Sequence, residues 1–244
     1  MNFNIRLAGL TIGLNSEYPA LKDFCQDYLA EEKAPDFSVS ITRKECMEEQ
    51  KRSFETGQEY SFDYLAQLAL LRRIGNILPA YGRCLLHGAS ITYQGSAYLF
   101  TAPSGTGKST HIRLWKEYLG SGVEIVNGDK PILSLEDSQI WIHGTPWAGK
   151  EGWQRNRSAV LRGICLLKQG KENRIERQEP WSCLPRLLKQ IYLPQEEGMA
   201  GETLRLLDRL LDIVPVYQLE CDRSEEAVRC SFEAMTGLSY KEGR

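Results

Sequence analysis

Residues 101–110, with the sequence TAPSGTGKST, place glycines, hydroxyl groups and a lysine at a spacing that suits phosphate binding. Gly105 and Gly107 allow the backbone to curl so that successive N–H groups point at phosphate oxygens. Lys108 supplies a positive charge near the β- and γ-phosphates, and Ser109 offers a hydroxyl to Mg²⁺. The segment therefore predicts a P-loop whose lysine is exposed and contacts phosphates rather than the core. The predicted nucleotide contacts in this loop are Ser104, Gly105, Thr106, Gly107, Lys108, Ser109 and Thr110.

The flanking segments favour this interpretation. A β-like run, 96–100, precedes the loop, and an amphipathic helical run, 109–119, follows it and adds the positive end of a helix. Ala102 stands where the general motif has glycine, and alanine is small enough to keep the prediction. The alternative is a glycine-rich turn that happens to end in Lys-Ser.

The segment before the loop predicts an unusual sheet. Residues 85–93 form a second β-like run, and Gln94-Gly95 joins it tightly to the strand that enters the loop. Two strands with so short a connection are antiparallel neighbours. Downstream, a short strand at 123–126 leads to Asp129. An acidic residue at a strand end beside a P-loop is the usual second anchor for Mg²⁺.

This part of the chain resembles the catalytic domain of HPr kinase/phosphorylase. The resemblance lies in His87-Gly88, the hairpin, 103–109 and Asp129. The resemblance covers about 85–170, including a strand at 159–167. It implies an α/β fold with the mixed-sheet P-loop kinase core of the HPr kinase and phosphoenolpyruvate carboxykinase type. The small N-terminal α/β segment would be an addition to that core.

The resemblance also implies roles for single residues. The family's histidine lies near the metal and the transferred phosphoryl group, and His87 matches it. The predicted catalytic residues are His87, Asp129 and Lys108. The predicted metal ligands are Ser109 and Asp129, and the implied cofactors are ATP and Mg²⁺. The family has two consecutive aspartates after the loop, whereas this chain has only Asp129, followed by Lys130.

A second glycine-rich segment, 142–153, has the sequence IHGTPWAGKEGW. Lys150 is predicted to reach the phosphates from it. Trp147 is equally compatible with stacking on a ligand and with filling the core. His111, inside the helix after the P-loop, has no partner at metal-ligand spacing and is expected to be structural.

Composition narrows the class of protein. The chain has 244 residues, 42% of them hydrophobic, which is enough for a substantial core. A net charge of −2 gives no polybasic face for nucleic acid. Seven scattered cysteines without a C-x-x-C pair predict reduced, mostly buried thiols. With no signal peptide and no apolar run long enough for a bilayer, we expect a cytoplasmic protein without a membrane partner.

Gly82 marks the predicted boundary between an N-terminal α/β segment, 1–82, and a P-loop nucleotide-binding kinase-like domain, 83–244; the segment could equally be part of one sheet with the core. Other expected elements are a strand or bent hairpin at 3–14, a helix at 18–29, a strand at 37–42, an exposed connection at 45–58, helices at 62–78, 183–192, 201–211 and 224–235, and a strand at 214–219.

The predicted activity is transfer of the γ-phosphoryl group of ATP to a Ser or Thr hydroxyl of a protein or peptide. A homo-oligomer is compatible with the sequence. Three alternatives stay open: a kinase for small molecules, a carboxykinase-like enzyme, and a nucleotide-binding protein without turnover.

Overall fold

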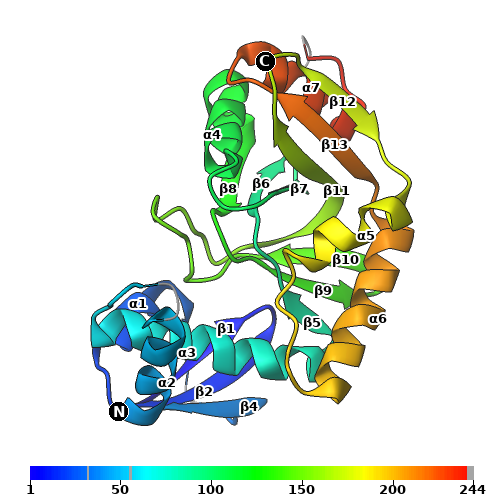
Figure 1. The fold of residues 1–244 in the computed structure, drawn as a ribbon. Coiled ribbons are helices and arrows are strands. Elements are labelled where there is room, and N and C mark those ends of the chain that lie inside the picture. The colour runs from blue at the N-terminus through cyan, green and yellow to red at the C-terminus, as the bar shows by residue number, and fades with distance from the viewer. Residues whose placement is uncertain (32, 55–56, 241–244) are drawn as a thin grey trace.

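Two β-sheets organise the molecule. The structure is a computed structural model, and it describes residues 1–31, 33–54 and 57–240. Within these residues, one sheet has the strand order β3-β1-β2-β4 and belongs to the N-terminal unit, which we define as residues 2–81. The second sheet has nine strands and belongs to the rest of the described chain. Figure 1 shows the N-terminal unit at the lower left, packed against the lower end of the larger sheet.

The N-terminal unit starts with a hairpin. Ala8 and Gly9 both have positive φ, 48° and 80°, as a two-residue hairpin turn requires, and they pair β1 with β2 in antiparallel register. The expected strand or bent hairpin is therefore a hairpin. The strands of this unit are β1 (Asn2–Leu7), β2 (Leu10–Ser16), β3 (Leu29–Ala30) and β4 (Phe37–Ile41).

Three α-helices cover this small sheet. They are α1 (Ala20–Phe24), α2 (Arg43–Phe54) and α3 (Phe62–Ile77). The helix expected at 18–29 is shorter, since the 3-10 helix Gln26–Tyr28 replaces its second half. α3 agrees with the prediction, and Ser61 caps it by accepting a hydrogen bond from the N–H of Tyr64.

α2 corrects the sequence prediction of an exposed connection at 45–58. Its acidic residues are not simply solvated, because Glu49 is buried and accepts two hydrogen bonds from Arg72 of α3. Glu45 accepts a hydrogen bond from the N–H of Thr42, which fixes the first turn. The charges therefore pair across two helices, and this pairing depends on a partner far along the chain.

The larger sheet is mixed and strongly curled. Its main order is β5-β9-β10-β11-β7-β6-β8, with β13 beside β11 and β12 beside β13. β7 pairs parallel with β11 and antiparallel with β6. The long β11 pairs with β10 near its start and with β13 near its end, so the sheet bends along this strand (Figure 1). The strands are β5 (Arg83–Leu85), β6 (Ala89–Tyr93), β7 (Ser96–Thr101), β8 (Val123–Asn127), β9 (Ile132–Glu136), β10 (Gln139–His143), β11 (Ser158–Gln169), β12 (Arg174–Arg177) and β13 (Val216–Cys221).

The predicted antiparallel hairpin is present as β6 and β7, with Gln94 and Gly95 at its turn. The strand expected at 85–93 is broken, however. β5 pairs with β9, and the N–H of His87 donates to the carbonyl of Gln190 at 2.7 Å instead of joining a strand ladder. His87 therefore lies just before the first arm of the hairpin, where sequence reasoning placed it on that arm.

Helices pack on both faces of this sheet. Alternate residues of β7 point to opposite sides: Leu99 packs with α5 and α6, whereas Phe100 packs with α4 and α7. The helices are α4 (Lys108–Leu119), α5 (Pro180–Leu188), α6 (Glu197–Ile213) and α7 (Glu225–Thr236). In the part of the chain that the structure describes, no helix has the length and apolar character needed to cross a membrane.

Candidate functional site

A glycine-rich loop, which we define as residues 102–107, joins β7 to α4. Gly105 and Gly107 have backbone φ angles of 79° and 112°, which residues with a Cβ atom rarely adopt. Gly107 is also the N-cap of α4 and provides no side chain to cap it. The first-turn N–H groups of α4 have no partners within the helix, so this end can bind an anion.

Lys108 differs from its prediction as an exposed residue. Its side chain is only 7% exposed, and Nζ donates to the carbonyls of Ala102 at 2.9 Å and Pro103 at 3.3 Å. The loop wraps around the ammonium, and its own first carbonyls compensate the charge. Burial lowers the pKa of Lys108, while the nearby Asp129 carboxylate opposes that shift.

His87 lies between Gln190 and Asp129. Its Nε2 is 3.3 Å from Oδ1 of Asp129, and its Nδ1 is 3.0 Å from Oε1 of Gln190. The side chain of Gln190, from the linker after α5, is nearly buried. Sequence reasoning missed Gln190, since only the fold brings this linker to the site.

Gln190 can pair with either neutral tautomer of His87. With Oε1 facing the ring, Gln190 accepts a hydrogen bond from Nδ1–H, and Nε2 carries no proton. Rotating the amide puts its NH₂ group on Nδ1 and leaves the proton on Nε2, which can then donate to Asp129. The orientation of one amide therefore selects which nitrogen of His87 carries the proton.

Asp129 is held by its neighbours at the end of β8. The side chain of Asn127 accepts hydrogen bonds from the N–H groups of Asp129 and Lys130, which fixes the turn. Burial disfavours the carboxylate, but the hydrogen bond from His87 and the charge of Lys130 outweigh it and lower the pKa of Asp129 to about 2. Nζ of Lys130 lies 2.9 Å from Oδ2 of Asp129. Asp129 is therefore an anion at neutral pH.

A side chain at position 128, directly before Asp129, has no room. A Cβ on Gly128 would lie 2.8 Å from the carbonyl oxygen of Ala148. The second glycine-rich segment, 142–153, thus closes over this turn, and Gly149 packs against the Cβ of Asp129. This close approach explains why glycine precedes Asp129.

The same segment is attached to the N-terminal unit. Trp147 is buried, and its Nε1 donates to the carbonyl of Gln67 at 3.0 Å, so it packs in the core and does not stack on a ligand. Tyr28 donates to Oε1 of Gln154 at 2.6 Å. Lys150 is exposed at the tip, and within the described residues no hydrogen bond or ion pair joins it to the glycine-rich loop.

His111 is buried among α4 and α7, as expected for a structural residue. Its Nε2 is 3.0 Å from the hydroxyl of Ser231, and Nε1 of Trp115 donates to the same nitrogen at 3.2 Å. Burial lowers the pKa of His111 to about 3, so the ring is neutral.

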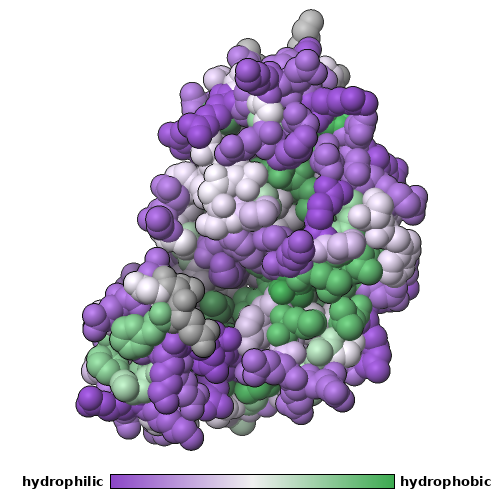
Figure 2. Space-filling view, in the orientation of Figure 1, coloured by the Kyte–Doolittle hydropathy of each residue, from purple (hydrophilic) through white to green (hydrophobic). Residues whose placement is uncertain are grey.

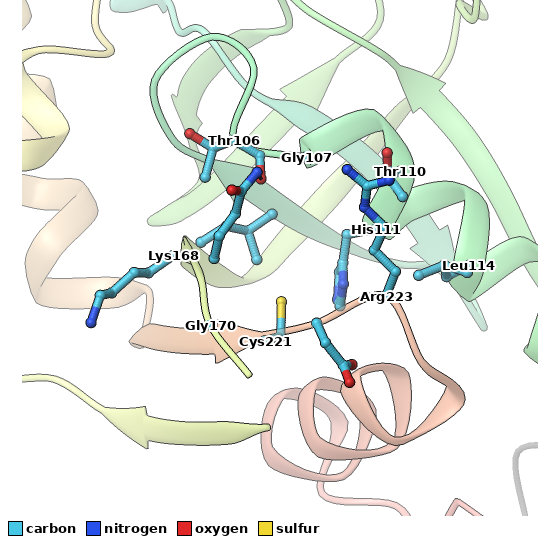
Figure 3. Close-up of a pocket in the computed structure, with 12 residues that line it drawn as sticks. Thr106, Gly107, Thr110, His111, Leu114, Lys168, Gly170, Cys221 and Arg223 are labelled. Carbon is cyan, nitrogen blue, oxygen red and sulfur yellow. Dashed lines mark hydrogen bonds between the residues drawn. The ribbon is translucent and has the colours of Figure 1, made fainter. Parts of the chain in front are cut away.

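A cavity of about 390 Å³ opens beside the glycine-rich loop. Thr106 and Thr110 line one side of it, and the ends of β11 and β13 line the other (Figure 3). Gly170, Cys221 and Arg223 come from these strand ends and were not recognised in the sequence. Strand ends that meet beside a helix N-terminus are a common position for ligands in α/β sheets.

The structure brings most of the predicted residues to one end of the sheet. Thr101, the last residue of β7, donates its hydroxyl to the carbonyl of His87 at 2.7 Å, and the N–H of Gly88 donates to the carbonyl of Asp129 at 2.9 Å. These bonds tie the start of the glycine-rich loop to His87 and Asp129. Ser109 lies in the first turn of α4, and Lys150 is the one predicted contact on a separate, exposed turn.

Comparisons with known proteins add little to this geometry. No protein-family model matches the chain, and no curated protein matches its sequence. One similar solved structure is described as "Structure of the Hpr(Ser) kinase/phosphatase from Coxiella burnetii". It is 13% identical with a TM-score of 0.37, and the match covers 63% of this chain and 99% of that chain. A likeness of this size supports no conclusion about activity.

Proposed function

We propose that the protein binds Mg-ATP at the glycine-rich loop and transfers the γ-phosphoryl group to a Ser or Thr hydroxyl of a protein or peptide. The observation that carries this proposal is the His87–Asp129 pair, hydrogen-bonded through its backbone to the end of β7 where the loop begins. Phosphoryl transfer asks a protein mainly for positioning and charge stabilisation, which such a group provides.

Residues 104–110, from the glycine-rich loop and the first turn of α4, would hold the phosphates. The uncapped end of α4 offers N–H groups, and Lys108 would exchange its two carbonyl contacts for phosphate oxygens. Lys150 would reach the same phosphates if its turn bends inwards. The exposed tip of that turn leaves its side chain free to move.

The donor set suits Mg²⁺. Asp129 is anionic and Ser109 offers a hydroxyl; Mg²⁺ prefers such oxygens and usually keeps water and substrate phosphates as its other ligands. Among the described residues no cluster of three or more His, Cys, Asp or Glu side chains could form a full protein cage, which fits a metal that arrives with the nucleotide. When bound, the ion would neutralise charge on the phosphates.

The proposed transfer forms a bond between the acceptor oxygen and the γ-phosphorus. The bond from that phosphorus to the β–γ bridging oxygen breaks, and ADP leaves with the electron pair. A carboxylate with a pKa of about 2 is a weak base, so Asp129 suits an electrostatic role. This step needs the tautomer of His87 in which Nδ1–H donates to Gln190 and Nε2 carries no proton. Nε2 would then take the hydroxyl proton and donate a hydrogen bond to Asp129, which would stabilise the resulting cation.

A protein or peptide acceptor fits the surface beside His87. α5 and the linker after it expose apolar side chains, with Trp181 51% and Leu193 46% exposed. Figure 2 shows hydrophobic surface in this region. Since Gln190 lies in the same linker and contacts His87, a polypeptide bound there would have its hydroxyl groups near the site.

One observation favours a second candidate, a nucleotide-binding protein without turnover. Lys130 pairs with the oxygen of Asp129 that does not face His87, so both oxygens of the Asp129 carboxylate are engaged. A metal would have to displace Lys130. This candidate predicts binding of ATP without transfer.

Purified protein incubated with γ-labelled Mg-ATP and whole lysate separates the candidates. Label on Ser or Thr of a protein band, lost with Lys108→Ala and kept with the exposed-lysine control Lys22→Ala, supports the proposal. Label on a small molecule would show that the acceptor is a small molecule and not a protein or peptide. Calorimetric ATP binding without any transfer supports the second candidate, and absence of both binding and transfer rejects both.

A further inference from the structure

We infer that the cavity beside α4 is a nucleoside subsite, and that it takes a purine base which forms a hydrogen bond with Nδ1 of His111. This inference rests on the proposed function, because the base belongs to the nucleotide whose phosphates the glycine-rich loop would hold. It assigns a ligand-reading role to a side chain that looks structural from its contacts.

The position of the cavity supports this assignment. Thr106, Gly107 and Thr110 belong both to the predicted phosphate contacts and to the cavity wall. A ligand with phosphates at these residues therefore has its remaining part beside the cavity. The volume of about 390 Å³ lies within the range of small-ligand pockets, roughly 300–1,000 Å³.

Nε2 of His111 already has polar partners. The indole N–H of Trp115, which is a donor only, lies 2.8 Å from Oγ of Ser231 and 3.2 Å from Nε2 of His111. Oγ of Ser231 lies 3.0 Å from the same nitrogen. Trp115 and Ser231 therefore hold the ring through Nε2, and Nδ1 is the other end of the imidazole.

Nδ1 of His111 has no hydrogen-bond partner. Within the described residues it is the one buried side-chain nitrogen or oxygen atom in this condition. The ring is only 3% exposed and lines the cavity (Figure 3). Native proteins rarely leave a buried polar atom unpaired, and a ligand seated in the cavity is one of the few partners that would satisfy it.

The other walls suit a flat base joined to a sugar. Leu114 and Leu167 add apolar surface to the cavity, and Cys221 adds a thiol. Asp222 also lines it, and its carboxylate can accept hydrogen bonds from ribose hydroxyls. The two fused rings of a purine fill such a space better than the single ring of a pyrimidine, and adenine offers Nδ1 of His111 both acceptor nitrogens and an amino donor.

Calorimetric titration of the full chain tests the inference with Mg-ATP, Mg-CTP and Mg-tripolyphosphate. We expect ATP to bind at least tenfold more tightly than either of the others. His111→Phe and Leu114→Trp should each reduce ATP affinity to the level of tripolyphosphate and leave tripolyphosphate affinity unchanged. Leu204→Trp, on an exposed position of α6, is the matched control and should keep the preference.

The outcomes distinguish this inference from the proposed function. Equal affinity of the wild-type protein for the three ligands overturns the nucleoside subsite and leaves the phosphate site in place. If none of them binds, the proposed function itself fails. A purely structural His111 would lower the melting temperature of His111→Phe without changing the ratio of the ATP and tripolyphosphate affinities, and that result also overturns the inference. The wild-type comparison needs no variant to fold.

Discussion

Nε2 of His87 lies 3.3 Å from Oδ1 of Asp129, and the Lys130 ammonium lies 2.9 Å from the other oxygen of the same carboxylate. The carboxylate therefore lies between an imidazole and an ammonium group. Gln190 completes the arrangement on the far side of the imidazole. These four side chains come from three segments of the chain, and the first predictions concern their separate roles.

Lys108→Ala should weaken Mg-ATP binding roughly 100-fold or more, since a charge-assisted contact to phosphate is lost. The fold should remain, because the lysine bonds only to two carbonyls of its own loop. Calorimetry measures the affinity and circular dichroism the fold, with Lys22→Ala as control. Wild-type affinity in Lys108→Ala would rule out the loop as the phosphate site.

Asp129→Asn should reduce kcat about 100-fold or more while ATP affinity changes only a few-fold, because charge aimed at the transition state acts mainly on kcat. Steady-state kinetics and ATP titration on the same preparation give the two quantities. Asp137→Asn, in the exposed turn between β9 and β10, should change neither. Normal turnover in Asp129→Asn would move the catalytic centre elsewhere.

Gln190 is a positioning residue for His87, and two substitutions separate this role from stability. Gln190→Leu should lower kcat roughly tenfold, because no acceptor then holds the tautomer with the proton on Nδ1. Gln190→Glu should lower kcat less, since a carboxylate oxygen still accepts a hydrogen bond from Nδ1–H. Gln195→Leu, exposed in the same linker, serves as control. Equal losses of kcat in both Gln190 variants would show that Gln190 contributes packing alone.

Two buried histidines predict how stability depends on pH. Burial lowers the pKa of His111 to about 3 and that of His143 to about 4, both below the ordinary value of 6.5. Between the folded-state pKa values and 6.5, the unfolded chain binds protons at these histidines and the folded chain does not. The free energy of unfolding therefore falls as the pH drops below about 6.5. Each histidine contributes a slope of up to ~1.4 kcal/mol per pH unit.

Urea unfolding at pH 7 and pH 5 measures this slope. His111→Phe and His143→Gln should each make the loss of stability on acidification smaller, whatever they do to stability at pH 7. A slope equal to that of the wild-type protein in both variants would show that neither ring is neutral in the folded state.

Local signals in the sequence predicted the hairpin and the loop that follows it. The Gln94-Gly95 turn, the glycine-rich loop and the start of α4 depend on residues within a short stretch, and all of them are present. The resemblance put His87 and Asp129 in one catalytic set, and their direct contact is a finding of the structure. Its hydrogen bond to Gln190 was not expected, because no local pattern indicates which linker returns to the site.

The misses share one cause, which is compensation at a distance. α2 was predicted as an exposed connection because Arg72, which pairs with the buried Glu49 together with the local Arg52, lies on another helix. Lys108 was predicted to be exposed because a sequence pattern does not show that the backbone carbonyls of its own loop accept hydrogen bonds from its ammonium group. The cavity is formed where β11 and β13 end beside α4, and these ends meet only after the sheet has formed.

The contacts of Trp147 with Gln67 and of Tyr28 with Gln154 have a consequence for dividing the chain at Gly82. A fragment that starts there would keep every residue of the proposed site, yet the segment that packs against Asp129 would lose the surface to which it is attached. Leu85 and Ile132 would also lose their apolar neighbours in the N-terminal core. Such a fragment would be a differently shaped protein and not a smaller version of this one.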